Sequence, residues 1–310
     1  MQKYFFTDRH MAYDVVIVGS GSAGLPAGMY ASRYKLKNVV IGKEPGGALA
    51  TSHKVENWPG VLSASGKEIM DNFAQHAENS GSEILQDTVS SITKTDIWFT
   101  VKTTNKEITC KYVVLASGNT YRKLWVPGEV EFLGKGVSYC ATCDGDFFKN
   151  RDIVLVGWWN TALTEALYLS ELCSKVYVVH RKDTFRAENI WVEQAQKRDN
   201  IEFVLNEEVN HIQGWFYLEE VVLKSGKILK ADGFFVAIGS DPSIELVKDM
   251  NPEIDNENCL IVDKRQETSV RWLYAAGDVT TNSNKFKQTI MSAAEGCLAA
   301  DSIHEDMLRG

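Results

Sequence analysis

A chain of 310 residues, 44% of them hydrophobic, is long enough for two globular domains with separate cores. Its formal net charge of −8 disfavours nucleic acid as a partner. No apolar run reaches the roughly 18 residues that span a membrane, and the N-terminal segment lacks the apolar core of a signal peptide. We therefore expect a cytoplasmic protein, whose six cysteines follow no framework pattern and suit a reducing compartment.

The first predicted strand, at residues 13–18, is an apolar run that leads into a glycine-rich turn and then a helix ending near Arg33. The turn has the G-x-G-x-x-G spacing of dinucleotide-binding units. Gly19 would make the tight turn, Gly21 would let the backbone approach a pyrophosphate, and Gly24 would let helix and strand pack closely. The alternative is a glycine turn that binds no ligand.

A second strand is expected at residues 38–41 and ends near Glu44, which follows Gly19 by 25 residues (44 − 19). An acid at about this distance can bind the hydroxyl pair of a ribose. The loops at 46–48 and 55–60 are rich in glycine and proline, and such loops beside a nucleotide site often contact the cofactor. By pattern alone, plain surface loops are equally compatible.

The next segments have helical spacing first and strand-like patterns afterwards, at residues 67–81, 89–92, 98–103, 107–110 and 112–118. Residues 119–136 contain Pro127-Gly128 and break this pattern. We therefore place a domain junction there.

Residues 138–145 read Ser-Tyr-Cys-Ala-Thr-Cys-Asp-Gly. Cys140 and Cys143 are spaced to close a small disulfide ring, in which one thiol pKa is lowered. The carboxylate of Asp144 lies next to the second sulfur and could move the proton of each exchange step. The alternatives are half of a zinc site or two small buried side chains. Zinc needs four ligands, and the other four cysteines are scattered singly.

A second strand–turn–helix–strand unit comes next, with its strands at 152–156 and 176–179 and its helix running to about Leu172. Bases rather than an acid stand at the tip of its second strand, as the 2′-phosphate of NADP requires. These bases are His180, Arg181, Lys182 and Arg186. The alternative is a solvated basic loop.

The turn of this unit departs from the dinucleotide pattern. Gly157 is in place, but Trp159 stands where a small residue belongs, and Trp158 precedes it. A side chain at this position fills the space that the pyrophosphate needs, and its Cβ blocks approach of the backbone to the pyrophosphate. Losing two charge-assisted hydrogen bonds would weaken binding roughly 10²- to 10⁴-fold. Alternatively, the unit is only structural and its tryptophans pack as core.

The C-terminal third begins with further strands and a hairpin turn, at residues 201–205, 221–223, 224–227 and 233–239. Trp215 lies between them and has no assigned role, and a second junction falls at 240–242. A strand at 272–276 ends in Gly277-Asp278, where open α/β sheets bind ligands. The N-terminus of an amphipathic helix at 288–303 could face the same ligand.

These motifs together resemble the low-molecular-weight thioredoxin reductases. The resemblance extends over essentially the whole chain from Tyr13. It rests on GSGSAG at 19–24, VENWPG at 55–60, CATCDG at 140–145, HRKDTFRAE at 180–188 and AAGDVT at 275–280. It implies an α/β protein of two Rossmann-like, three-layer ββα nucleotide-binding domains, the second inserted into the first. Residues 1–123 and 245–310 would form the FAD-binding domain, and 124–244 a pyridine-nucleotide-type domain that carries the redox disulfide.

The resemblance also implies roles for single residues. The positions that match non-covalent FAD contacts are Gly19, Gly21, Gly24, Glu44, Asn57, Gly277, Asp278 and Gln288. Cys143 matches the thiol that faces the flavin, Cys140 the thiol that attacks thioredoxin, and Asp144 the acid–base. The family implies a homodimer with two domain orientations, for which segments 122–125 and 240–243 would be the hinges.

The donor site is where this chain departs from the family. His180, Arg181 and Arg186 match the 2′-phosphate residues, and Lys182 replaces an arginine, but Trp158 and Trp159 replace a glycine-rich turn. We expect FAD and the dithiol to work while NADPH binds poorly, so that a ferredoxin-type protein or a reduced deazaflavin supplies electrons. The alternatives are an FAD-dependent dithiol oxidase that uses oxygen, an NADPH-blocked engineered variant of an ordinary thioredoxin reductase, and a flavoprotein without turnover that binds a redox partner.

Overall fold

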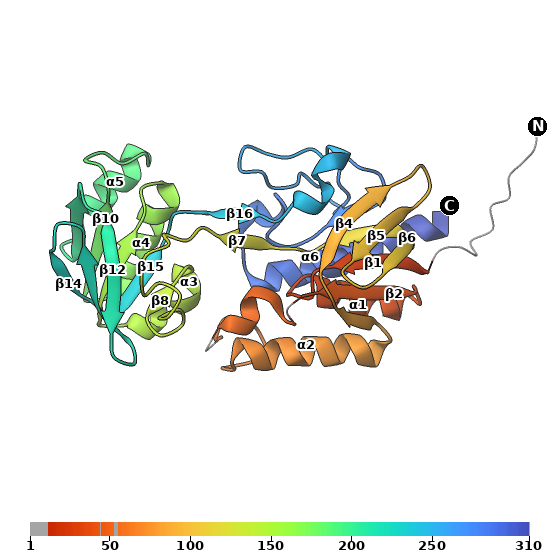
Figure 1. Ribbon diagram of the computed structural model, residues 1–310, viewed down its shortest axis with the longest axis horizontal. Helices are drawn as coiled ribbons and strands as arrows, with labels where there is room; N and C mark the ends of the chain where they lie inside the picture. The colour runs from red at the N-terminus through yellow and green to blue at the C-terminus, as the bar shows by residue number, and fades with distance from the viewer. Residues whose placement is uncertain (1–11, 44, 53–54, 310) are drawn as a thin grey trace, which may run out of the picture. The chain divides into compact units, whose positions relative to one another are not determined.

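The computed structural model describes residues 12–43, 45–52 and 55–309. The chain divides into two compact units, shown in Figure 1. Unit 1 comprises Met1–Thr120 and Asp241–Gly310, and unit 2 comprises Tyr121–Ser240. The chain passes between the units in β7 (Asn119–Tyr121) and β16 (Ser240–Pro242), which pair with each other. No helix in the described ranges is both long and apolar enough to cross a bilayer.

Unit 1 is built on a sheet whose centre is parallel. Its strands are β3 (Glu83–Gln86), β2 (Asn38–Gly42), β1 (Tyr13–Val18), β6 (Glu107–Leu115), β5 (Phe99–Thr103) and β4 (Val89–Lys94), in that order, with β17 (Leu273–Ala275) also paired to β6. In the centre, Val16 of β1 pairs with Val39 on one side and Val113 on the other. Strands β4 and β5 run antiparallel to their neighbours.

Strand β6 corrects one prediction. The sequence predicted separate strands on either side of Lys111, but residues 107–115 form one continuous strand. Its first half pairs antiparallel with β5 and its second half pairs parallel with β17. Lys111 lies within this strand, and its ammonium group is 5.9 Å from the centroid of the Trp272 ring.

The central sheet of unit 1 is buried on both faces, which explains its uninterrupted apolar strands. Helices α1 (Gly24–Arg33), α2 (Gly66–Ser80) and α6 (Thr289–Arg309) contribute to the core on one face, where Ile17 packs with helix residues such as Leu25 and Ile303. On the other face, Val16 packs with Phe99 and Val101 of the antiparallel strands.

Unit 2 repeats the three layers. Its parallel sheet is ordered β11 (Ile201–Leu205), β10 (Lys175–His180), β9 (Asp152–Val156), β15 (Gly233–Val236) and β8 (Val137–Ser138). Helices α4 (Asn160–Leu172) and α5 (Asn189–Gln196) contribute to the core on one face. The antiparallel strands β12 (Val209–Gly214), β13 (Leu218–Leu223) and β14 (Ile228–Lys230) cover the other. The predicted fold class, two three-layer Rossmann-like units with the second inserted in the first, is confirmed.

The remaining elements are short: α3 (Ala141–Asp144) and the 3₁₀ turns η1 (Gly47–Thr51), η2 (Gly145–Phe148), η3 (Glu245–Met250) and η4 (Ser283–Lys285). Helix α6 extends six residues beyond its predicted end at 303, and β15 ends at Val236 rather than at residue 239. The sequence pattern defines the C-terminal ends of α6 and β15 less clearly than their centres.

Two glycines let backbones meet at the end of β1. A Cβ at Gly24 would lie 1.8 Å from the carbonyl oxygen of Gly19, and a Cβ at Gly296 of α6 would lie 2.0 Å from the carbonyl oxygen of Ala23. Neither position has room for a side chain. The first turn of α1 is therefore fixed between β1 and α6.

We expect Gly296→Ala to lower the free energy of unfolding by about 1–3 kcal/mol, because the added methyl group must push α6 away from α1. Urea unfolding followed by circular dichroism measures this. Leu298→Ala, at a 40% exposed position of the same helix, is the control and should change stability by no more than about 0.5 kcal/mol. Equal midpoints for Gly296→Ala and the unchanged chain would show that the contact is not tight.

Candidate functional site: a disulfide turn and two nucleotide-type turns

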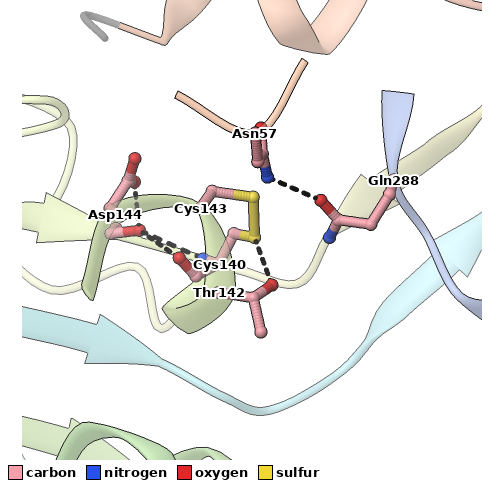
Figure 2. Close-up of a disulfide and its surroundings, with 7 residues drawn as sticks. Asn57, Cys140, Thr142, Cys143, Asp144 and Gln288 are labelled. Carbon is pink, nitrogen blue, oxygen red and sulfur yellow. Dashed lines mark hydrogen bonds between the residues drawn. A yellow bond between two sulfur atoms is a disulfide. The ribbon is translucent and has the colours of Figure 1, made fainter. Parts of the chain in front are cut away.

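The two cysteines of the Cys-x-x-Cys segment are joined by a disulfide, with Cα atoms 5.3 Å apart (Figure 2). Cys140 is the N-cap of the four-residue helix α3. Its carbonyl oxygen accepts hydrogen bonds from the amides of Cys143, at 3.2 Å, and Asp144, at 3.1 Å. This single turn brings the sulfurs together. It also excludes the zinc interpretation for this form, because two sulfurs bonded to each other are not thiolate ligands.

The polar side chains of Thr142 and Asp144 lie on the disulfide turn itself (Figure 2). The hydroxyl of Ser138 donates to Oδ2 of Asp144 at 2.5 Å and accepts from the amide of Cys140 at 3.1 Å. The hydroxyl of Thr142 lies 3.5 Å from Sγ of Cys140. Asp144 is therefore held to the same turn as the disulfide through Ser138. Sequence reasoning missed this function of Ser138, because no spacing rule links a serine to a carboxylate six residues later.

The other thiols have little access to exchange chemistry. Cys110, Cys173 and Cys259 are buried, and Cys297 is partly buried. Burial raises the pKa of Cys110 to about 12 and those of Cys173 and Cys297 to about 11. A buried thiol disfavours the thiolate that attacks disulfides. Thiol chemistry is therefore concentrated at Cys140 and Cys143.

The glycine-rich turn of unit 1 has the predicted strand–turn–helix setting. Gly19 has a φ of +118°, which a side chain would strain. No side chain caps the N-terminus of α1 in the described part of the chain. The amide of Leu25 donates to the carbonyl oxygen of Gly21 at 3.2 Å and Pro26 has no amide proton, so an anion would be bound by amides of the turn that precedes Leu25. The nearest atoms to a Cβ at Gly21 would be Gly47 Cα, at 3.8 Å, and the carbonyl oxygen of Gly46, at 3.9 Å. Glu44, the predicted ribose ligand, lies outside the described residues.

Four more predicted FAD residues lie on other segments of unit 1. Nδ2 of Asn57 donates to Oε1 of Gln288 at 3.0 Å (Figure 2), which ties the 55–60 loop to the residue before α6. Asp278 follows Gly277 at the end of β17, where burial raises the pKa of its carboxyl. A Cβ at Gly277 would lie 3.1 Å from Cβ of Ala23. The glycine turn and Gly277 are thus neighbours.

The turn of unit 2 is also tight at its first position. A Cβ at Gly157 would lie 2.4 Å from Cβ of Ala162. After it, the ring of Trp158 stacks on that of His180, with centroids 5.6 Å apart, and the guanidinium of Arg181 lies 5.1 Å from the Trp158 centroid. The phosphate-type residues therefore contact the indole that interrupts the turn.

Trp159 makes a second such contact. It is the N-cap of α4 and 49% exposed, and the guanidinium of Arg186 lies 5.5 Å from its ring centroid. The amide of Arg186 donates to the carbonyl oxygen of Trp158 at 3.0 Å. Trp158 is partly buried, so the interpretation as core packing fits Trp158 better than Trp159.

His180 is 3% exposed, and burial lowers its pKa. Its Nε2 lies 3.0 Å from the carbonyl oxygen of Thr184, while Nδ1 has no hydrogen-bond partner within the described residues. The side chain of Lys182 is exposed.

Burial also raises the pKa of Glu165, on α4, to about 7, and sequence reasoning did not single out this group.

Trp215, which has no assigned role from the sequence, lies between β12 and β13 and is 82% exposed. Phe216 and Tyr217 beside it are 74% and 69% exposed. The three rings form the tip of a hairpin in unit 2.

A family model described as pyridine nucleotide-disulphide oxidoreductase matches residues 13–296. The thioredoxin reductase of Treponema pallidum (strain Nichols) is 39% identical over 295 residues, which cover 93% of this chain and 95% of that protein. The crystal structure of thioredoxin reductase from Streptococcus pyogenes MGAS5005 matches with a TM-score of 0.90 at 33% identity, covering 96% of this chain and 99% of that one.

A further solved structure, a ferredoxin-flavin thioredoxin reductase from Clostridium acetobutylicum, matches with a TM-score of 0.52 at 31% identity and covers 96% of this chain and 99% of that one. On the family model and the curated relative, the chain belongs to the pyridine nucleotide-disulphide oxidoreductases and, within them, to the low-molecular-weight thioredoxin reductases, which are flavin-dependent disulfide oxidoreductases.

Proposed function

We propose that this chain is an FAD-dependent thioredoxin-disulfide reductase that passes electrons from a donor through FAD to the Cys140–Cys143 disulfide and on to thioredoxin. We further propose that Trp158 and Trp159 impair its use of NADPH. The observation that carries the proposal is the disulfide closed on a single turn with Asp144 held beside it. We propose a cytoplasmic homodimer, in which 1–123 and 245–310 bind FAD and 124–244 carry the disulfide.

Unit 1 fits FAD on its own geometry. The glycine turn that leads into α1 can donate amides to a pyrophosphate, and close backbone approach needs Gly21. Asp278, Asn57 and Gln288 offer polar groups for the rest of the cofactor, and Glu44 would bind a ribose. When bound, FAD takes up two electrons from a donor and delivers them to a disulfide.

The exchange chemistry depends on the disulfide turn. Two electrons and two protons convert the Cys140–Cys143 disulfide to two thiols. The thiolate of Cys140 then attacks the thioredoxin disulfide, which forms a mixed disulfide and releases one thioredoxin thiolate. Cys143 attacks the sulfur of Cys140, so thioredoxin leaves reduced and the Cys140–Cys143 bond forms again. Asp144 takes a proton from the attacking thiol and returns one to the departing thiolate.

The contacts of the two indoles support impaired NADPH binding. Arg181 and Arg186, the guanidinium groups suited to a 2′-phosphate, lie over Trp158 and Trp159. Cation–π pairs of this kind contribute about 0.5–2 kcal/mol each. A nucleotide would have to break both pairs and also bind without the amides of a glycine turn.

A different donor is therefore part of the proposal. A ferredoxin-type protein or a reduced deazaflavin would supply electrons to the bound FAD, with an arrangement of the two units that differs from the one used for substrate. The similarity to a ferredoxin-flavin thioredoxin reductase over 96% of this chain supports a protein donor. The hinge segments would be 122–125 and 240–243.

We expect the double variant Trp158→Gly/Trp159→Gly to bind NADPH about 10²- to 10⁴-fold more tightly than the unchanged chain, because the backbone amides regain access to the pyrophosphate. Anaerobic titration with NADPH, reduced ferredoxin and dithionite in parallel, with flavin absorbance as readout, measures this.

Trp215→Gly replaces an exposed tryptophan of the same unit and is the control, which should leave NADPH binding unchanged. Rapid flavin reduction of the unchanged chain by micromolar NADPH would contradict the blocked site. Oxygen uptake with small dithiols, together with no thioredoxin turnover under dithionite, would favour a dithiol oxidase instead.

We expect Cys143→Ser to accumulate a covalent adduct with thioredoxin, because Cys140 can attack but the mixed disulfide has lost its resolving thiol. Non-reducing gel electrophoresis and mass spectrometry of the adduct measure this. The matched variant Cys140→Ser should trap far less, since it keeps only Cys143. An adduct that forms equally well in both variants would remove the assigned order of the two thiols, and the absence of any adduct would count against exchange with thioredoxin.

A further inference from the structure

Glu295 is a buried carboxylate that no part of the proposed electron path uses. It lies on α6 and is 6% exposed. Its Oε2 accepts from the amide of Gly277 at 2.7 Å and from the hydroxyl of Thr280 at 3.2 Å. Its Oε1 accepts from the hydroxyl of Ser283 at 2.6 Å. All three donors belong to the segment 277–283, so one side chain holds that whole segment against α6.

The segment 277–283 needs such a support. It leaves β17 through Gly277, with a φ of +83°, and ends at Ser283, whose φ of +53° lies in the left-handed region. A non-glycine residue in that region is strained and persists only when its surroundings fix it. Asp278, the expected FAD ligand, is the second residue of this segment. The hydrogen bonds that Glu295 accepts hold the backbone on either side of Asp278, and the hydroxyl of Ser292 donates to Oδ1 of Asp278 itself at 3.4 Å.

Gly296, the residue after Glu295 on α6, contacts the glycine turn at 19–24. Gly296 packs against the carbonyl oxygen of Ala23, at the start of α1, where a Cβ would lie 2.0 Å away. Gly277 packs against the methyl group of the same alanine. Consecutive residues of α6 thus contact the glycine turn through packing and the 277–283 segment through hydrogen bonds.

We propose that Glu295 is a positioning residue for flavin binding, which keeps Asp278 and the Gly277 peptide in register with the glycine turn at 19–24. The proposal rests on the proposed binding of FAD to unit 1. The hydrogen-bonding pattern decides what a substitution does. A glutamine amide can still accept from Gly277 and Thr280 with its oxygen and can donate to Ser283 with its nitrogen. An alanine leaves the half-buried Gly277 amide without this acceptor.

The test compares Glu295→Ala with Glu295→Gln in the FAD-loaded protein. Release of FAD is followed as the rise of flavin fluorescence on dilution, and affinity is measured by titrating FAD back into the stripped protein. We expect Glu295→Ala to weaken FAD binding about 10- to 100-fold. We expect Glu295→Gln to stay within about threefold of the unchanged chain. Ser283→Ala, which removes one of the three donors, is the milder variant if Glu295→Ala folds poorly, and should weaken binding about two- to fivefold.

Glu129→Ala is the matched control in unit 2. Glu129 is also buried, at 1% exposure, and also accepts three hydrogen bonds, from the amides of Leu124 and Trp125 and the hydroxyl of Tyr139. It should lower the unfolding temperature as much as Glu295→Ala but leave FAD affinity unchanged. A purely structural effect of Glu295 would make the two variants alike in FAD affinity and would overturn the proposal.

Two further outcomes overturn the inference. Equal FAD affinity of Glu295→Ala and the unchanged chain would show that the hydrogen bonds of Glu295 do not affect FAD binding, although the chain still binds FAD. Equal losses in Glu295→Gln and Glu295→Ala would assign the effect to negative charge rather than to hydrogen bonding. A failure of the unchanged chain to bind FAD is a different result, because it removes the proposed function as well.

Discussion

Backbone approaches that leave no room for a Cβ determine where both nucleotide-type turns lie. In unit 1, Gly24 meets the carbonyl oxygen of Gly19 and Gly296 meets that of Ala23. In unit 2, a Cβ at Gly157 would lie 2.5 Å from the carbonyl oxygen of Ala237 and 2.4 Å from Cβ of Ala162 at the start of α4. Each contact fixes a helix N-terminus at the end of a parallel strand, the place where open α/β sheets bind ligands. The two units therefore share one architecture and differ in the residues that come after the first glycine of the turn.

Because tryptophans follow the first glycine of the turn in unit 2, the basic residues of that unit contact aromatic rings. Arg181 and Arg186 lie over indole rings, and His180 stacks between Trp158 and Phe185. Basic residues at this place would ordinarily be explained by a phosphate. Here aromatic rings contact Arg181, Arg186 and His180, so these three residues have partners within the chain besides any phosphate.

Much of the fold could be predicted because buried parallel strands are apolar throughout and are followed by glycine turns. The first strand and the strand at 152–156 have the predicted bounds. Strand β12 was missed because its sequence, VNHIQG, is largely polar and its pairing with β13 shifts register. Helix α5 was missed too, and it has only eight residues. The disulfide pair could be predicted from spacing, whereas the hydrogen bonds of Ser138 and Glu295 depend on contacts that no local pattern encodes.

The cysteine inventory has a practical consequence. Cys110, Cys173 and Cys297 have raised pKa values, and Cys259 is buried, so brief reduction would expose just one pair of sulfurs that reacts quickly. A maleimide dye or spin label applied at that moment would mark a single location in unit 2. Spectroscopic probes could then be attached to the natural chain without first removing any other cysteine.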